Sequence, residues 1–332
     1  MCMNSVFTTP PPSFSNDEAF SVLKSKFAIS GTLERLPSDR DQVFHVQGDA
    51  DSYILKIYNS AEETSVVELQ DAAAGYIMKN DKSLLVPKYL QNPRCIKKKN
   101  LTYPLRLTSY YTGSFLSEKN LETSDYFVLG EFIGRLTRAL EQFNHEGANR
   151  SFLWDAARAD LIKGYLSYIP SKSDRDILNY FLHDFEINAQ PVLSGLKRSV
   201  IHNDANDNNI ILDDNNNITG IIDLGDMVFS NRCVEIATCM AYVAILEDST
   251  YESLKSLLMG YLSIIDLNKK EIQCILHIMC NRLCISVIMA SWRRTLFPNN
   301  DYLTISLAPA WDFLRKLRLE SFSLVRKKIF ND

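Results

Sequence analysis

The chain has 332 residues, of which 46% are hydrophobic and 23% are charged. This is the composition of an ordinary globular protein, long enough for one large domain or for two lobes. The net charge of -4 and the isoelectric point of about 5.8 argue against a dedicated nucleic-acid-binding protein, which carries a basic surface and a high isoelectric point.

The cysteines and the N-terminus bear on the cellular setting. The seven cysteines form no Cys-x-x-Cys pair and no Cys/His cluster with zinc spacing, so we expect free thiols in a reducing cytoplasm. Residues 1–15 lack the basic and apolar regions of a signal peptide and are rich in Thr and Pro, which predicts a disordered tail. The longest apolar run, 233–246, contains Glu235 and is too short to span a bilayer, so no membrane association is expected.

The first third of the chain predicts a small sheet with one long helix, because alternating and helical hydrophobic periods follow one another. The expected elements are a helix at 17–28 capped by Asn16, strands at 43–47 and 53–59 joined by the turn 48–52, a helix at 62–80, and strands at 84–90 and 103–111.

The rest of the chain is mainly helical by the same criteria. Helices are expected at 125–143, 174–187, 233–247, 251–264, 269–293 and 308–328. One segment breaks the pattern, because apolar runs at 210–212 and 218–223 flank the turn residues 213–217, as in a hairpin. The sequence therefore predicts an α+β protein, with a small β-rich lobe followed by a larger helical one.

The segment that contains this hairpin, 202-HNDANDNNIILDDNNNITGIIDLGD-226, concentrates acidic and amide side chains. Kinase-type phosphoryl transfer uses a carboxylate for the acceptor hydroxyl, oxygen ligands for Mg²⁺ and a cation for the phosphates. Asp204 is followed by Asn209, and Asp223 ends the second strand of the hairpin, which is the kinase spacing of a catalytic Asp and of the Mg²⁺ ligands.

A nucleotide site of this kind also needs a strand Lys, which a helix Glu commonly positions against the phosphates. Lys56 lies in 54-ILKI-57, and Glu68 lies early in the following helix. A strand Lys and a helix Glu are each ordinarily solvated. The order and combination of these residues, rather than any one of them, therefore indicates a nucleotide site.

The motifs HNDANDNN and GIIDLGDM resemble the aminoglycoside phosphotransferase and choline kinase superfamily, whose fold is protein-kinase-like and bilobal. The stretches 35-RLPSDRDQVFHV-46, 67-VELQ-70 and 152-FLWD-155 are similar to the hydroxylysine kinase subfamily, including kinase modules fused to class-III aminotransferases. The resemblance implies an N-lobe at 16–108 and a C-lobe at 109–332.

The resemblance also implies roles for individual residues. These are Asp204 as catalytic base, His202 orienting its loop, Asn209 and Asp223 as Mg²⁺ ligands, Lys56 and Glu68 as the phosphate-positioning pair, Tyr110 and Tyr111 beside the nucleobase, and the turn with Ser38, Asp39 and Asp41 in place of the phosphate-covering loop.

The implied co-substrate is ATP or GTP with Mg²⁺. The implied acceptor is a small amino alcohol or hydroxy amino acid, foremost 5-hydroxy-L-lysine, with a functional link to a PLP-dependent aminotransferase-fold lyase. Such an acceptor needs a carboxylate for its ammonium and a cation for its carboxylate, for which Asp226, Glu235, Asp155 and Arg282 are candidates. Three of them have a structural alternative: Asp155 suits a helix cap, and Glu235 and Arg282 suit buried ion pairs.

Two other functions stay open. A kinase for another small alcohol, such as homoserine, choline, ethanolamine or an aminoglycoside, would use the same motifs, although the basic segment 312–332 argues against an aminoglycoside. A non-catalytic pseudokinase scaffold is expected to lack at least one of the key residues, and all four are present: Lys56, Asp204, Asn209 and Asp223.

Overall fold

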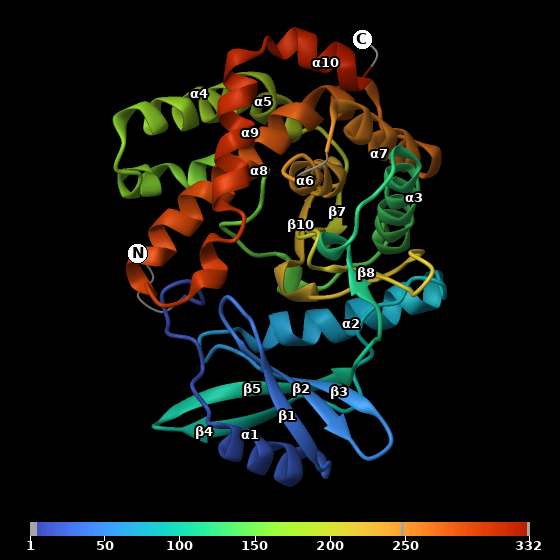
Figure 1. Cartoon of the computed structure of the whole chain (residues 1–332), viewed down its shortest axis with the longest axis vertical. Helices are drawn as coiled ribbons and strands as arrows, with labels where there is room; N and C mark the ends of the chain where they lie inside the picture. The colour runs from blue at the N-terminus through green and yellow to red at the C-terminus, as the bar shows by residue number, and fades with distance from the viewer. Residues whose placement is uncertain (1–4, 247–248, 331–332) are drawn as a thin grey trace.

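The computed structural model describes residues 5–246 and 249–330. A small sheet forms one lobe and a set of helices forms the other, with the helix α2 (Thr64–Asn80) between them (Figure 1). This confirms the expected α+β, bilobal, kinase-like architecture.

The small lobe contains a five-stranded antiparallel sheet in the order β1-β2-β3-β5-β4. Its strands are β1 (Gly31–Leu36), β2 (Gln42–Gly48), β3 (Ser52–Ile57), β4 (Arg94–Lys98) and β5 (Leu101–Ser109). The predicted hairpin is β2 and β3, and the predicted strand at 103–111 is β5. The strands β1 and β4 were not predicted, because they lie at the sheet edges and their side chains are partly or fully exposed.

The alternation along β3 directs one side chain to each face of the sheet in turn. Leu55 and Ile57 are buried in a core that they share with helix α1 (Asn16–Val22) and the π-helical turn Leu23–Phe27. Lys56, between them, therefore faces the other side, toward the larger lobe.

Two expectations for the small lobe are wrong. Residues 84–90 form no regular strand: Leu85 and Tyr89 make isolated bridges to Gly220 and Thr108, and Pro87 between them has no N–H to donate to a ladder. The helix at 17–28 is capped by Ser15 rather than Asn16, since the Ser15 hydroxyl accepts from the Glu18 N–H in a capping box.

The prediction of a disordered tail at residues 1–15 is also wrong for residues 5–15. Residues 1–4 lie outside the described part of the chain. Phe7 and Phe14 are buried. Phe7 packs on Phe152 with ring centroids 5.5 Å apart. The Gln42 amide both accepts from the Phe14 N–H and donates to its carbonyl, each at 2.8 Å. A segment that buries aromatic side chains and pairs its backbone is ordered despite its composition.

Within the described ranges, the larger lobe contains thirteen further elements of regular structure in addition to short 3₁₀ turns. They are β6 (Ser114–Phe115), α3 (Thr123–Leu140), α4 (Lys172–Asn188), α5 (Gln190–Leu193), β7 (Arg198–Ile201), β8 (Ile210–Leu212), β9 (Ile218–Ile221), β10 (Val228–Asn231), α6 (Cys233–Val243), α7 (Tyr251–Ile264), α8 (Lys269–Leu296), α9 (Leu307–Leu319) and α10 (Phe322–Phe330).

The helices predicted in this lobe are found near their expected bounds, with one exception. The single helix expected at 308–328 is two helices, α9 and α10, with Ser321 between them, and Ser is a favoured residue at the start of a helix. The predicted helix at 233–247 is α6, and residue 247 lies outside the described part of the chain.

Helix α8 crosses the centre of the larger lobe. By length and hydropathy alone it could span a membrane, but 83% of its apolar window is buried inside the protein, as in the core helix of a globular protein. Because α8 is surrounded by other elements, two of its arginines, Arg282 and Arg293, are also buried and need partners.

Candidate active site

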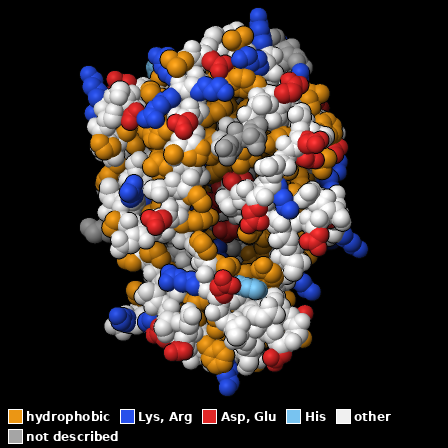
Figure 2. Space-filling model, in the orientation of Figure 1, with side chains coloured by type: hydrophobic (Ala, Val, Ile, Leu, Met, Phe, Trp, Pro, Cys, Tyr) orange, Lys and Arg blue, Asp and Glu red, His pale blue; other side chains and the backbone are white. Residues whose placement is uncertain are grey.

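A cavity of about 470 Å³ lies between the two lobes, and residues from β1 to α9 line it. Figure 2 shows the hollow near the middle of the molecule, with acidic side chains in and beside it. Of the fifteen site residues suggested by the sequence, eleven line this cavity: Ser38, Asp39, Asp41, Lys56, Tyr110, Tyr111, Asp204, Asn209, Asp223, Asp226 and Arg282.

Asp204 lies on the loop between β7 and β8. Its Oδ1 accepts from Arg282 Nη2 at 2.7 Å, and its Oδ2 accepts from the amides of Asn206 at 2.9 Å and Asn209 at 3.0 Å. Burial raises the pKa of Asp204 to about 6, although Arg282 opposes this effect. A carboxylate with a pKa near 6 is ionised at neutral pH and is a competent general base.

His202 lies beneath this loop and does not line the cavity. Its Nε2 is 3.0 Å from the carbonyl oxygen of Ile222, and its Nδ1 accepts from the Asp204 N–H at 3.2 Å. These partners assign the proton to Nε2. His202 therefore joins the loop of Asp204 to the strand that leads to Asp223, and it is a positioning residue.

Glu235 supports the same loop from below. Its Oε2 accepts from the backbone N–H of His202 at 2.5 Å, and burial raises the pKa of Glu235. Glu235 is fully buried and does not line the cavity. The expectation that it contacts substrate is therefore wrong, and the alternative of a buried ion pair is not found within the described ranges either, because the partner of Glu235 is a backbone N–H.

Asp155 is also structural. Its Oδ1 accepts from the Ala157 N–H at 3.0 Å and from the Ser230 hydroxyl at 2.8 Å, and it is buried away from the cavity. Asp155 therefore stabilises a turn and does not cap a helix, because the next helical turn begins at Ala159 with Arg158 as its N-cap. Both the substrate-binding expectation and the helix-cap alternative are wrong.

Asn209 and Asp223 present oxygens beside Asp204. The Asn209 amide nitrogen donates to Asp204 at both its backbone oxygen, 2.9 Å, and its carboxylate, so the amide oxygen is directed away from Asp204. Asp223 adopts a left-handed backbone conformation with φ 58°, an uncommon geometry that concentrates at functional sites. Its Oδ1 accepts from Lys56 and from the Gly225 N–H, while 48% of its side chain is exposed to the cavity.

These oxygens fit Mg²⁺. Within the described ranges, no group of three or more His, Cys, Asp or Glu side chains could hold a metal by itself. A site with one carboxylate and one amide oxygen is nevertheless what Mg²⁺ uses when phosphates and waters supply the remaining ligands. Burial would raise the pKa of Asp223, but Lys56 and Arg40 outweigh it and hold that pKa well below its usual range, so the carboxylate is ionised.

Lys56 is paired differently from expectation. Its Nζ lies 3.0 Å from Asp223 Oδ1 and 3.1 Å from Asp41 Oδ2, whereas Glu68 is exposed on α2 and does not line the cavity. The strand register explains why Asp41 takes the place expected for Glu68. Val43 of β2 lies opposite Lys56 of β3, and Asp41, two residues before Val43, lies on the same face of the sheet as Lys56. Gln70, rather than Glu68, faces the cavity from α2.

Aromatic side chains line another part of the cavity. Tyr110 and Tyr111 follow β5 and line it. The Tyr110 ring lies 4.2 Å from the His45 ring, and the Tyr111 hydroxyl donates to the Val86 carbonyl at 3.0 Å. Ser38 lines the cavity on the loop between β1 and β2, and its carbonyl accepts from Asn300 at 3.3 Å.

Three arginines at the site have long-range partners that local sequence patterns did not identify. Arg40 pairs with Asp226, Arg293 with Asp39, and Arg282 with Asp204. The signal for Arg282 and Arg293 is a charged residue inside the apolar helix 269–296, because buried charges are paired or functional. Arg40 carried no comparable signal.

Comparisons with known proteins agree with this geometry. A sequence model of the phosphotransferase enzyme family matches residues 32–256, a range that includes Lys56, Asp204, Asn209 and Asp223. The chain is 25% identical over 342 residues to a curated hydroxylysine kinase of Mus musculus, covering 92% of this chain and 90% of that protein.

Solved structures show the same fold at low identity. A microcompartment-associated aminopropanol kinase matches with a TM-score of 0.69 and 16% identity, over 91% of this chain and 98% of that one. An amicoumacin kinase, solved with AMP-PNP and Ca²⁺, matches with a TM-score of 0.66 and 16% identity, over 90% of this chain and 93% of that one.

Proposed function

Since this chain belongs to the phosphotransferase enzyme family, we propose that it transfers the γ-phosphoryl group of ATP or GTP to the hydroxyl of a hydroxylated amino compound, with 5-hydroxy-L-lysine as the leading acceptor. The chain is a small-molecule kinase that takes a nucleotide co-substrate. The acceptor is proposed from the hydroxylysine kinase relatives, whose similarity extends over nearly the whole chain.

The observation that carries the proposal is the position of Asp204, Asn209, Asp223 and Lys56 around one cavity, where Asn209 contacts Asp204 and Lys56 contacts Asp223. In the proposed reaction Asp204 receives the proton of the acceptor hydroxyl as the hydroxyl oxygen bonds to the γ-phosphorus. The bond from that phosphorus to the bridging oxygen breaks, and the nucleoside diphosphate leaves.

Asn209 and Asp223 would hold Mg²⁺, which neutralises negative charge on the phosphate oxygens when bound. Lys56 is placed for the phosphates, because Asp41 and Asp223 hold its ammonium at the cavity wall. Burial would lower the pKa of Lys56, but these two carboxylates outweigh it and raise that pKa, so the cation is retained.

Of the four acceptor-binding residues suggested by the sequence, Asp226 and Arg282 line the cavity, and we propose that they face the charged groups of the acceptor. Arg282 lies against the rings of Trp154 and Tyr242, 4.9 and 5.3 Å from their centroids. It also donates to Asp204, so the same guanidinium orients the base.

We also propose a reducing, cytoplasmic setting, because the six cysteines in the described part of the chain are unpaired. A phosphorylated amino alcohol carries a good leaving group. A PLP-dependent lyase of the aminotransferase fold, to which the sequence suggests a functional link, would eliminate this phosphate group.

The proposal is tested by nucleotide consumption with ATP or GTP and Mg²⁺, over a panel of 5-hydroxy-L-lysine, homoserine, ethanolamine, choline and an aminoglycoside. Asp204→Asn is the matched control, because it conserves size but removes the base. Turnover with hydroxylysine that the variant loses supports the proposal. Turnover with another alcohol keeps the chemistry and overturns the acceptor. Equal turnover by Asp204→Asn overturns the role of Asp204, and nucleotide binding without turnover on any alcohol favours a pseudokinase.

A further inference from the structure

The loop between β1 and β2 has an unusual composition for its position. Kinase-type sites cover the nucleotide phosphates at this point with a glycine-rich loop. Here residues 37–41 read Pro-Ser-Asp-Arg-Asp and contain no glycine. The loop instead presents one cation, Arg40, between two carboxylates.

Both neighbouring carboxylates are neutralised by other cations. Asp39 accepts from Arg293 of α8, with both of its oxygens 2.5 Å from the same nitrogen. Asp41 pairs with Lys56 at 3.1 Å. Arg40 therefore does not neutralise the carboxylates of its own loop, and its positive charge faces the cavity.

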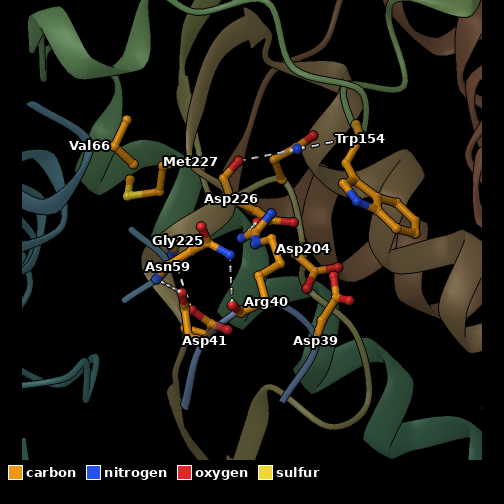
Figure 3. A network of polar contacts seen from close by, with 12 residues as sticks. Asp39, Arg40, Asp41, Asn59, Val66, Trp154, Asp204, Gly225, Asp226 and Met227 are labelled. Atoms are coloured by element: carbon orange, nitrogen blue, oxygen red, sulfur yellow. Dashed lines mark hydrogen bonds and ion pairs between the residues drawn. The ribbon is translucent and has the colours of Figure 1, made fainter. Parts of the chain in front are cut away.

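The Arg40 side chain is fixed and directed into the site. Its guanidinium lies 5.6 Å from the Phe7 ring centroid and 5.7 Å from that of Phe152, and its Nη2 donates to Asp226. Figure 3 shows it reaching from its loop into the space among Asp226, Gly225 and Asp204. Asp226 is the one side chain that bonds to this guanidinium within the described ranges, and a guanidinium has five donor hydrogens.

Gly225 marks where the two cations meet. A Cβ atom placed on Gly225 would lie 3.6 Å from Arg40 Nη2, 3.7 Å from Lys56 Nζ and 3.1 Å from Asp223 Oδ1. Arg40 and Lys56 thus surround one point beside the carboxylate assigned to Mg²⁺. Arg40 is also close enough to help lower the pKa of Asp223.

We infer that Arg40 is a second phosphate-binding cation of this site, whose planar guanidinium contacts the terminal phosphates of a nucleoside triphosphate opposite Lys56. The inference rests on the proposed kinase function. A guanidinium matches the geometry of phosphate oxygens and can replace contacts that a glycine-rich loop makes with its backbone. The rival explanation is that Arg40 only ties its loop to the larger lobe through Asp226.

The two explanations are separated by equilibrium binding of a non-hydrolysable nucleoside triphosphate with Mg²⁺, compared with the bare nucleoside. The variants are Arg40→Gln, Arg40→Lys and Asp226→Asn. If Arg40 binds phosphate, Arg40→Gln weakens triphosphate binding roughly 10- to 100-fold and leaves nucleoside binding unchanged. Asp226→Asn removes the ion pair with Arg40 but leaves the Arg40 guanidinium in place, so triphosphate binding is unchanged or becomes tighter.

Arg40→Lys is the second variant, in case Arg40→Gln proves unstable in thermal unfolding. Lysine retains the aliphatic side chain and the positive charge of Arg40 but lacks the planar guanidinium. Intermediate weakening by this variant, specific to the triphosphate, supports the inference. Equal weakening by Arg40→Gln and Asp226→Asn, or no change in either Arg40 variant, overturns it. A wild-type protein that binds the triphosphate no more tightly than the nucleoside contradicts the kinase function itself, which is a different result.

Discussion

Replacing Arg282 by Gln removes the cation that faces the catalytic carboxylate, and we expect the acid limb of the pH–rate profile to move to higher pH. The wild-type limb is set by Asp204, whose pKa is about 6. Because the base acts in its ionised form, kcat/KM rises with pH through this value and then levels off.

The size of the change follows from the contact between the two groups. Arg282 Nη2 lies 2.7 Å from Asp204 Oδ1. Opposite charges about 4 Å apart interact by about 4 kcal/mol at an effective dielectric constant of about 20. A carboxylate beside an arginine has its pKa lowered by about 1 to 3 pH units. Without the cation, burial acts unopposed by Arg282, and the limb should move from about 6 to roughly 7–9.

The assay is kcat/KM for the acceptor measured between pH 5 and pH 9 (about the range in which such a base titrates) for wild type, Arg282→Gln and Arg282→Lys. The lysine variant is the matched control, because it keeps the charge while losing the planar fork. We expect its acid limb to stay near that of the wild type. The glutamine variant should lose kcat/KM at every pH through its proposed contact with the acceptor, and it should lose roughly tenfold more at pH 7 than at high pH.

An acid limb that stays in place in Arg282→Gln would refute the reasoning, because Asp204 would then titrate independently of its cation. A uniform loss of rate at every pH, with no shift of the acid limb, would show instead that Arg282 acts only by binding the acceptor or by holding structure through its bonds to the Trp154 carbonyl and the Tyr242 hydroxyl. Thermal unfolding of each variant distinguishes that loss from simple misfolding.

Two further predictions follow from corrected expectations. Asp41→Asn should lower kcat/KM for the nucleotide by about tenfold, because it weakens the charge-assisted contact to Lys56. Glu68→Gln should leave steady-state kinetics unchanged. A loss of kcat/KM in Glu68→Gln but not in Asp41→Asn would show that Glu68, as expected from the sequence, is the partner of Lys56. Phe7→Ala should lower the free energy of unfolding by about 3 kcal/mol, measured by urea denaturation, because the ring is buried against Phe152; an unchanged midpoint would show that the N-terminal segment contributes nothing to stability.

The proximity of the residues proposed to be catalytic and metal-binding could be predicted from the sequence because they are local to one hairpin. Asp204 and Asn209 are five positions apart on the same loop, and the chain returns through β8 and β9 to Asp223. Turn residues and strand alternation fix such a hairpin without reference to the rest of the protein. The position of Lys56 was predictable for the same reason, since the alternation in β3 places it opposite Leu55 and Ile57.

The partners of the charged side chains were not predictable in this way. Glu68 was a reasonable partner for Lys56 by its place in the chain, but the rotation of α2 turns Glu68 to solvent and Gln70 toward the cavity. The disordered tail was inferred from composition, and the burial of Phe7 beneath Arg40 depends on a surface that forms only when both lobes are folded.

The sequence by itself thus determined the bilobal α+β architecture, the catalytic loop and the chemistry of phosphoryl transfer, because hydrophobic period, turn chemistry and motif spacing are local properties of the chain. Only the tertiary structure decided that Glu235 and Asp155 support the site from beneath, and that Arg282 and Arg40 enter it. Their contacts join residues 33 to 186 positions apart. Packing brings such residues together, and the low dielectric of the interior then favours an ion-pair or hydrogen-bond partner for each buried polar group.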